Sequence, residues 1–219
     1  MGKPNVHQCA EPGRDCNLCG RLVAFRNQNR VAEPSWFNGA VPSFGDADAR
    51  LLIVGLAPGL KGANRTGRPF TGDYAGDLLY ATLIEYGFAK GRYEARPDDG
   101  LRLSSCMISN AVRCVPPGNK PTPDEIKACR PFLSARITAL PNVSAILALG
   151  RIAHDQTLTA LEQRKSAFPF AHGARHAIRP GLELFDSFHC SRYNTNTGRL
   201  TAEMFRAVFK QIRAKLDKT

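Results

Sequence analysis

Short apolar runs along the chain predict the strands of a sheet that is buried on both faces. The clearest runs are residues 50–55, 105–110 and 143–150, and a weaker run at residues 182–188 predicts a fourth strand. Their hydrophobicity is continuous rather than alternating, which is typical of parallel strands covered from both sides. Two of the runs end at a glycine, where a chain can turn sharply.

Helical patterns lie between and after these runs. Residues 76–86 carry apolar side chains at helical spacing, and residues 201–216 form a basic amphipathic pattern. Thr122, with Glu125 three residues later, predicts a strong helix start. Pro131 is expected to kink or shorten that helix, because proline has no N–H to donate.

Strands that alternate with helices predict an α/β fold. We expect a three-layer α/β/α sandwich around a central, mainly parallel four-stranded sheet. All 219 residues are expected to form a single domain, because no linker or repeat interrupts the pattern. Open sheets of this kind bind ligands beyond the carboxyl ends of their strands, so functional residues are expected there.

The chain is strongly basic. It has 30 Lys and Arg against 19 Asp and Glu, a formal net charge of +11. Such an excess favours a polyanionic partner, because side chains that neutralise phosphates release counterions. Residues 1–11 lack the apolar core of a signal peptide, and no later run has transmembrane length. We therefore expect a cytoplasmic protein that does not bind membranes.

Four of the seven cysteines are spaced like metal ligands. Cys16 and Cys19 form a C-x-x-C pair, and Cys114 and Cys129 can complete a shell of four thiolates. Such a site would fasten the N-terminal segment to the middle of the fold. The pattern alone suits a structural zinc as well as an iron–sulfur cluster. An odd number of cysteines favours a reducing compartment over a disulfide framework.

Polar segments follow the predicted strands. Residues 55–73 contain several glycines, which let the backbone approach a ligand, and Arg65 and Arg68 as candidates for phosphate contacts. This segment lacks the spacing of a phosphate-binding P-loop. Asn110 ends the second strand, and residues 187–198 carry hydroxyl, amide and arginine side chains that suit a DNA backbone.

In their order along the chain, these segments resemble the uracil-DNA glycosylase superfamily. The likeness is closest to family 5, its iron–sulfur branch with broad base specificity, and it covers nearly the whole chain. The stretches that carry it are DCNLCGRLV at 15–23, GLAP at 55–58, NRTGRPFTGD at 64–73, NAVRCVPP at 110–117, HCS at 189–191 and NTG at 196–198. Each stretch alone is a weak signal, but their joint order is specific.

The resemblance implies hydrolysis of the N-glycosidic bond between deoxyribose and uracil, or another deaminated base such as hypoxanthine, in DNA. His189 matches the histidine that donates a hydrogen bond to the departing base. Phe70 matches the aromatic residue on which the extruded base stacks. Asn110 matches the strand-end asparagine of the pocket and is our first candidate to orient the water. Asn64 and Asp73 are the further candidates for that role.

Two departures from the superfamily pattern bear on this pocket. Most branches place an acidic or amide residue shortly after Gly55, whereas this chain, like family 5, has an apolar stretch that includes Ala57. Gly55 and Ala57 are expected to contact the base, and the lack of a carboxylate there leaves room for deaminated purines. Cys190 replaces the proline that usually follows the histidine, so the backbone there is less restricted.

The resemblance also implies partners and a cofactor. The residues expected to contact DNA are Arg65, Arg68, Ser191, Arg192, Asn194 and Asn196. The residues expected to bind a 4Fe-4S cluster, with zinc as the less favoured occupant, are Cys16, Cys19, Cys114 and Cys129. The expected partner is DNA that contains uracil or another deaminated base. We expect a monomer associated with the nucleoid.

Two alternatives stay open at this point. A nucleic-acid-binding iron–sulfur protein that kept the scaffold but has weak or no catalysis is consistent with Ala57 and Cys190. An iron–sulfur electron-transfer or regulatory protein would show a reversible redox couple and no glycosylase activity. Release of uracil from duplex DNA distinguishes the enzyme from both.

Overall fold

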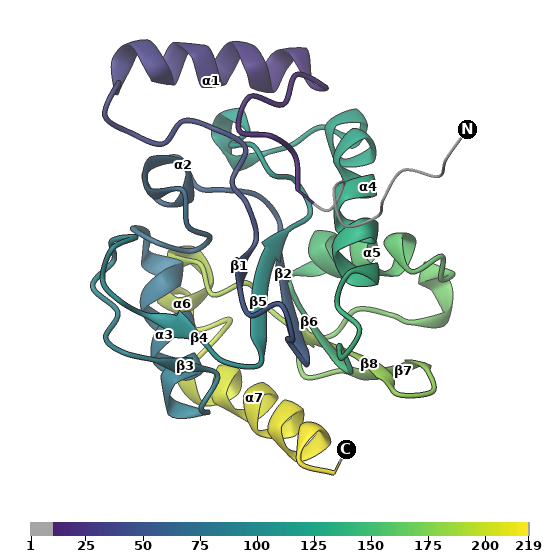
Figure 1. The fold of residues 1–219 in the computed structure, drawn as a ribbon. Coiled ribbons are helices and arrows are strands. Elements are labelled where there is room, and N and C mark those ends of the chain that lie inside the picture. The colour runs from purple at the N-terminus through teal and green to yellow at the C-terminus, as the bar shows by residue number, and fades with distance from the viewer. Residues whose placement is uncertain (1–10, 219) are drawn as a thin grey trace.

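A six-stranded sheet forms the centre of the computed structural model, which describes residues 11–218 (Figure 1). Its strands, in spatial order, are β1 (Phe44–Gly45), β5 (Cys106–Asn110), β2 (Leu51–Gly55), β6 (Ala145–Leu149), β8 (Leu182–Ser187) and β7 (Arg175–Arg179). The four inner strands run parallel, and β1 and β7 are antiparallel edges. The predicted α/β class with a mainly parallel sheet is confirmed.

The predicted strand number is wrong, because the sheet has six strands rather than four. The four inner strands coincide with the apolar runs, and every residue of β2, β5 and β6 is buried. In β7, exposed and partly buried residues alternate, and β1 is only two residues long. Neither edge strand therefore has the continuous apolar run that reveals a buried strand.

Helices cover both faces of the sheet and give the expected three layers (Figure 1). The covering helices are α3 (Tyr74–Glu85), α4 (Pro123–Thr138), α5 (Arg151–Ala160) and α7 (Ala202–Leu216). Successive residues of a strand point to opposite faces. Leu51 and Ile53 accordingly pack in the cluster formed with α3 and α7. Leu52 and Val54 pack in the cluster formed with α4 and α5.

The start of α4 agrees with the sequence, but its course does not. Thr122 accepts a hydrogen bond from the Glu125 N–H, and the Glu125 side chain accepts one from the Thr122 N–H in return. Of the two predicted effects of Pro131, a kink or a shorter helix, the shortening is wrong, because α4 continues to Thr138. Pro131 and Lys127 are both exposed, so water can satisfy the Lys127 carbonyl that Pro131 leaves without a donor.

The remaining elements are short, apart from one helix near the N-terminus. They are α1 (Gly20–Ala32), α2 (Ala63–Thr66), β3 (Ala89–Lys90), β4 (Arg102–Leu103), α6 (Arg192–Asn196) and the 3-10 turns Pro117–Asn119 and Lys165–Ala167. Within the described residues, every helix is too short or too polar to span a bilayer.

The inner strands end together at one edge of the sheet. Gly55 at the end of β2 pairs with Asn110 at the end of β5, and Leu149 of β6 pairs with Ser187 of β8. The loops that follow these strands include the glycine-rich segment and the segment that carries His189. Parallel topology therefore brings the polar segments of the sequence to one end of the molecule.

Candidate active site

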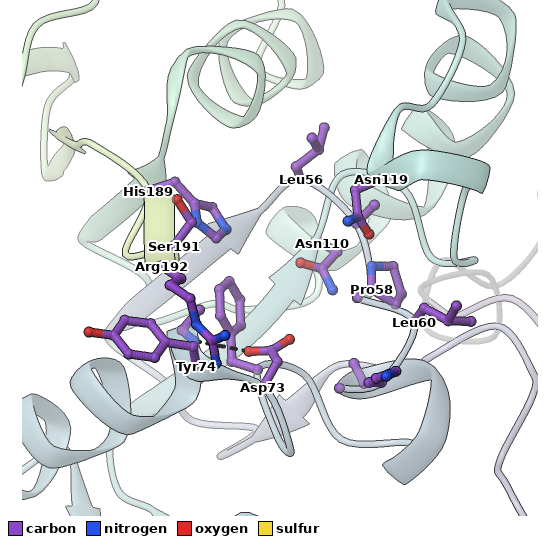
Figure 2. A pocket seen from close by; sticks show the side chains of 17 residues that line it. Leu56, Pro58, Leu60, Asp73, Tyr74, Asn110, Asn119, His189, Ser191 and Arg192 are labelled. Atoms are coloured by element: carbon purple, nitrogen blue, oxygen red, sulfur yellow. Dashed lines mark hydrogen bonds between the residues drawn. The ribbon is translucent and has the colours of Figure 1, made fainter. Parts of the chain in front are cut away.

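A cavity of about 620 Å³ opens at the carboxyl ends of the inner strands (Figure 2). Loops after β2 and β8, the end of β5 and the first turn of α3 form its wall. The residues that line it are 56–63, Phe70, 73–75, Asn110, Asn119, His189, Ser191 and Arg192. Its volume lies in the range of small-molecule pockets, and its place is the usual ligand site of open α/β sheets.

Phe70 lies at the base of this cavity in a strained backbone conformation. Its φ is 53°, in the left-handed region that a bulky residue rarely adopts. Its ring stacks against the His189 imidazole, with centroids 5.8 Å apart and planes 29° apart. A Cβ on Gly55 would come within 2.7 Å of Phe70 Cζ, so only glycine fits at the end of β2.

Asn110 presents a polar atom without a partner. Its side chain is 3% exposed, and its Oδ1 accepts no hydrogen bond from any described residue. A buried acceptor left in this state costs about 1–3 kcal/mol. The amide points into the cavity (Figure 2), which suits a ligand that brings its own donor.

His189 follows β8 and reaches the cavity from its opposite side (Figure 2). Burial of the ring lowers the pKa of His189 to about 4, so the imidazole is neutral at physiological pH. Asn194 Nδ2 donates a hydrogen bond of 2.8 Å to the His189 carbonyl and fixes the backbone there. A neutral imidazole with a free N–H can donate to a ligand without carrying a charge into the site.

Asp73 brings a carboxylate to the same cavity. It caps α3, and its Oδ1 accepts a hydrogen bond of 3.1 Å from the Ala75 N–H. Its Oδ2 lies against the glycine-rich loop, since a Cβ on Gly59 would be 2.9 Å from that oxygen. Burial raises the pKa of Asp73, while the N–H groups of Gly76 and Ala75 oppose the rise.

Two predicted site residues lie elsewhere. Asn64 is fully buried, is not part of the cavity wall, and donates a hydrogen bond of 2.8 Å to Asn38 Oδ1. Arg68 is only 4% exposed and forms two hydrogen bonds of 2.7 Å with Asp99. Its guanidinium also lies over the rings of Phe44, Tyr80 and Tyr93. The expected phosphate contact of Arg68 is therefore wrong: its charge serves the interior.

Some of the other predicted DNA-contact residues are exposed, and others stabilise the loop that follows His189. Arg65, Arg192 and Asn196 are exposed, and Arg192 also lies over the Tyr74 ring at the cavity rim. Ser191 lines the cavity and caps α6. The amide nitrogen of Asn194 is occupied by the His189 carbonyl, so Asn194 supports the loop.

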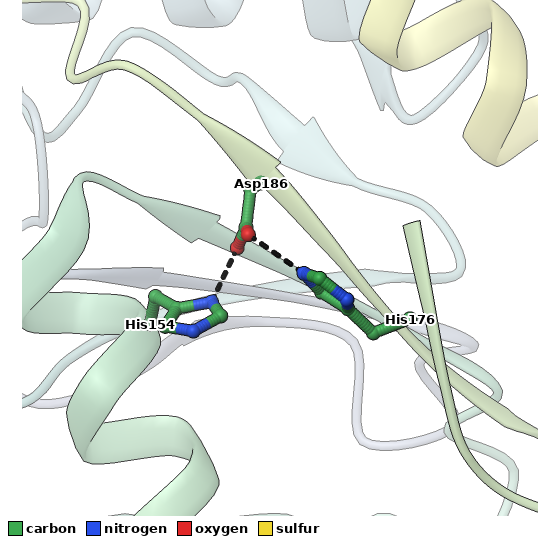
Figure 3. Close-up of side chains that lie close together, drawn as sticks. All are labelled: His154, His176 and Asp186. Carbon is green, nitrogen blue, oxygen red and sulfur yellow. Dashed lines mark hydrogen bonds and ion pairs between the residues drawn. The ribbon is translucent and has the colours of Figure 1, made fainter. Parts of the chain in front are cut away.

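A second histidine cluster lies on the face of the sheet toward α5 (Figure 3). Fully buried Asp186 of β8 accepts hydrogen bonds from His154 Nδ1 at 2.7 Å and His176 Nε2 at 3.0 Å. His154 Nε2 in turn donates to the Phe168 carbonyl at 2.8 Å. The cluster joins α5, β7 and β8, and its Asp186 precedes His189 by three residues. Nothing in the sequence pattern predicted this cluster.

The four predicted metal ligands meet in a separate small pocket. Cys16, Cys19, Cys114 and Cys129 line it, and none forms a disulfide. The Arg113 N–H donates to Cys129 Sγ at 3.3 Å, and Arg26 Nη1 lies 3.9 Å from Cys114 Sγ. Burial raises the pKa of Cys114 to about 12 and that of Cys129 to about 11.

Comparison with known families agrees with this geometry. Residues 42–213 match the model of the uracil DNA glycosylase superfamily, which covers most of the chain. The chain belongs to the uracil-DNA glycosylase superfamily. Both the expected α/β architecture and the resemblance stated from sequence motifs are thereby confirmed.

Relatives place it near one branch of that superfamily. A Type-5 uracil-DNA glycosylase of Thermus thermophilus is 48% identical over 202 residues, which span 90% of this chain and 91% of that protein. One from Mycobacterium bovis is 39% identical over 204 residues, 90% of this chain and 76% of its own. One from Pyrobaculum aerophilum is 36% identical over 204 residues, 91% of this chain and 88% of its own.

Sequence reasoning missed several residues of this uracil-DNA glycosylase cavity. Lys61, Tyr74 and Asn119 line it without having been singled out. Lys61 belongs to the glycine-rich segment already identified, so its position was within reach. Asn119 ends the 3-10 turn that follows the stretch 110–117. No sequence pattern marks it as a cavity residue.

Proposed function

We propose that this chain is a DNA-repair hydrolase that removes uracil from DNA and leaves an abasic site. The observation that carries the proposal is the unpartnered Asn110 Oδ1, buried in the cavity that Phe70 and His189 also line. A base extruded from the helix would offer N–H groups to that acceptor. The Type-5 uracil-DNA glycosylase names of the relatives support the same reaction.

The extruded base stacks on Phe70. A base inserted between two parallel rings needs about 7 Å, twice the usual contact distance of roughly 3.5 Å. The Phe70 and His189 centroids are 5.8 Å apart, which is too close for such a sandwich. The base therefore lies against Phe70 and meets His189 at its edge, where a carbonyl oxygen can accept the imidazole N–H.

Cleavage of the bond leaves negative charge on the departing base and positive charge on the sugar. The neutral His189 donates its N–H to the oxygen on which the negative charge develops. The Asp73 carboxylate, which also lines the cavity, stabilises the positive charge on the sugar. These two groups act on opposite ends of the breaking bond.

Water attack then needs orientation more than a strong base. Asn110 remains the first choice to orient the water, and Asp73 is the second, because both side chains face the cavity. Asn64 is withdrawn from this role, since it is bonded to Asn38 outside the cavity wall.

The base range extends to deaminated purines such as hypoxanthine. The wall formed by residues 56–58 carries no charged or amide side chain that would exclude a larger ring. The cavity of about 620 Å³ is ample for a purine. An excision panel with uracil, hypoxanthine, xanthine and hydroxymethyluracil measures this range.

DNA approaches over the cavity rim. Arg65, Arg192 and Asn196 are exposed there or nearby and suit phosphate contacts. Tyr193 on α6 is 72% exposed, an unusual state for a large aromatic side chain. Its place next to Ser191 and Arg192 suits a wedge that enters the helix where the base has left.

The four cysteines suit a 4Fe-4S cluster, with zinc as the less favoured occupant, because four thiolates that line one pocket can bind either. Cys16, Cys19, Cys114 and Cys129 would bind the cluster, and the Arg113 N–H would stabilise a thiolate. When bound, the cluster cross-links the N-terminal segment to the core.

The remaining expectations complete this proposal. The chain acts as a monomer and one domain, within the cell and on chromosomal DNA. Iron and inorganic sulfide in the purified protein would support the cluster, whereas stoichiometric zinc would contradict it.

Release of free uracil from a uracil-containing duplex tests the reaction. Wild-type protein should release the base, and Asn110→Ala should lose most of the rate while still binding duplex. Asn119→Ala is the matched control, because this exposed amide also lines the cavity. If wild-type protein binds duplex but releases no base, the chain is a binding protein and the proposal is wrong.

A further inference from the structure

An open groove lies beside α2, which also borders the cavity proposed to hold the extruded base. We call that cavity the base cavity. We name the open groove the Trp36 groove; its volume is about 520 Å³, and its lining residues are Arg14, 34–37, Arg65, Thr66 and 95–97. Gly62 and Ala63, at the start of α2, line the base cavity. Arg65 and Thr66, at the end of the same helix, line the groove. The two sites therefore border the same short helix.

The groove is cationic. Three arginines and no acidic residue line it. Arg14 donates to the Phe37 carbonyl and Arg65 to the Lys61 carbonyl, and neither forms a salt bridge with any described carboxylate. A guanidinium has five N–H donors, so both retain donors for a phosphate.

The third arginine is paired, but only weakly. Arg96 is 3.0 Å from Glu94 and 3.8 Å from Asp98, and its side chain is 58% exposed. Exposed ion pairs of this kind contribute little, about 0–1 kcal/mol. A phosphate can therefore compete with these carboxylates for Arg96.

An aromatic surface accompanies the charge. Trp36, the single tryptophan of the chain, is partly exposed in the groove. The backbone beside it is fixed, because the Phe37 N–H donates to the Arg65 carbonyl at 2.9 Å. The Phe37 ring packs closely against Gly67 at the end of α2. A Cβ added at Gly67 would lie only 2.7 Å from that ring. Guanidinium groups beside an aromatic ring are the usual components of sites for single-stranded nucleic acid.

We propose that the Trp36 groove binds a nucleotide of the DNA strand that flanks the extruded base, with its phosphate on Arg65 and Arg14 and its base on Trp36. The inference rests on the proposed function, because that function brings the DNA to α2. Because α2 borders both the base cavity and the groove, a strand that passes the cavity can reach the groove.

Trp36 reports on the groove directly, because tryptophan emission has no other source in the chain. We expect an undamaged duplex to quench or shift this emission, with half-saturation at the concentration that gives half-maximal anisotropy of a labelled duplex. Unchanged emission at saturating DNA would overturn the proposal. This measurement uses no excision, so it stays informative whether or not uracil is released.

Charge variants give the second test. Arg14→Gln with Arg65→Gln should weaken binding of undamaged duplex about tenfold and lower the salt slope by about two, one per phosphate contact. Arg164→Gln with Arg179→Gln is the control, with the same charge change at exposed arginines outside both sites. Equal losses in the two double variants would overturn the proposal, because they would reflect net charge alone.

Removal of the ring gives the third test. Trp36→Leu keeps bulk but loses stacking, and affinity should fall about fivefold or more. Its thermal unfolding is compared with that of wild-type protein. If this variant does not fold, the emission titration and the arginine variants still decide the matter.

Discussion

Two histidines close to the same strand show opposite chemistry. His189 lies beyond the end of β8 in the base cavity, and burial without a charged partner lowers its pKa to about 4. His154 lies behind β8 with a hydrogen-bond acceptor at each ring nitrogen. Burial opposes its charge, but the hydrogen bond and negative charge of Asp186 outweigh burial and raise the pKa of His154.

The different surroundings of His189 and His154 distinguish a candidate ligand site from a cluster that stabilises the fold. The polar atoms of the His154, His176 and Asp186 cluster satisfy one another, so the cluster stabilises the fold. In the base cavity Asn110 Oδ1 is left without a donor, an arrangement that a bound base can relieve. An unpaired buried acceptor that also lines a cavity, as Asn110 Oδ1 does, therefore distinguishes the candidate ligand site from the paired histidine cluster.

The largest expected effect is on stability and comes from the paired histidine. His154→Ala leaves the fully buried Asp186 without its closest partner and should lower the free energy of unfolding by about 3–5 kcal/mol. Urea unfolding measures the loss. Arg151→Ala, at an exposed position of the same helix, should stay within about 0.5 kcal/mol of wild type. Similar values for both variants would contradict a structural role for the cluster.

The next effect is on catalysis and comes from the unpaired histidine. His189→Ala should lower the single-turnover rate of uracil excision about 100- to 1,000-fold, the usual loss of one donor to a developing anion. Stability should change little, because the His189 ring has no hydrogen bond or ion pair with any described side chain and loses only its contact with the Phe70 ring. His189→Asn, which keeps an N–H donor, should recover part of the rate. A full rate in His189→Ala would remove the imidazole from the mechanism.

Phe70 gives a smaller effect and tests whether it belongs to the cavity or to the core. Phe70→Leu keeps bulk but loses base stacking worth about 1–3 kcal/mol, so excision from duplex should fall accordingly. The ring is 7% exposed, and a purely structural residue would lose as much stability as activity. Parallel measurement of kcat/KM and of urea unfolding distinguishes these outcomes.

The two histidines also differ in the pH dependence they give to stability. The folded pKa of His189 is below the ordinary 6.5, so its contribution to stability is present above pH 6.5 and is lost toward pH 4. The folded pKa of His154 is above 6.5, so its contribution is present below that pH and is lost as pH rises through the raised pKa.

Unfolding measured from pH 4 to 8 reveals both slopes, neither steeper than about 1.4 kcal/mol per pH unit. His189→Asn should flatten the acid side of the profile, and His154→Ala should flatten the alkaline side. Parallel profiles for wild type and variants would mean that other groups set the pH dependence.

The sequence revealed what depends on local pattern and order. Apolar runs identified the inner strands, and parallel strands must end together, so Asn110 and His189 could be assigned to one site from the sequence alone. The buried position of Arg68 could not be predicted. The sequence shows its charge but not its ion pair with Asp99, which holds the side chain in the interior. The His154 cluster and the Trp36 groove each combine segments far apart in the chain, which only the tertiary fold brings together.

The burial of Arg68 has a consequence for how damage is found. Its bonds to Asp99 and its contacts with three aromatic rings hold the loop that carries Phe70 in a single shape. In the proposed function, Phe70 is thus already placed for the base before DNA binds. Scanning of the genome would then be limited by how often a mispaired base opens on its own, and the protein would capture such openings passively.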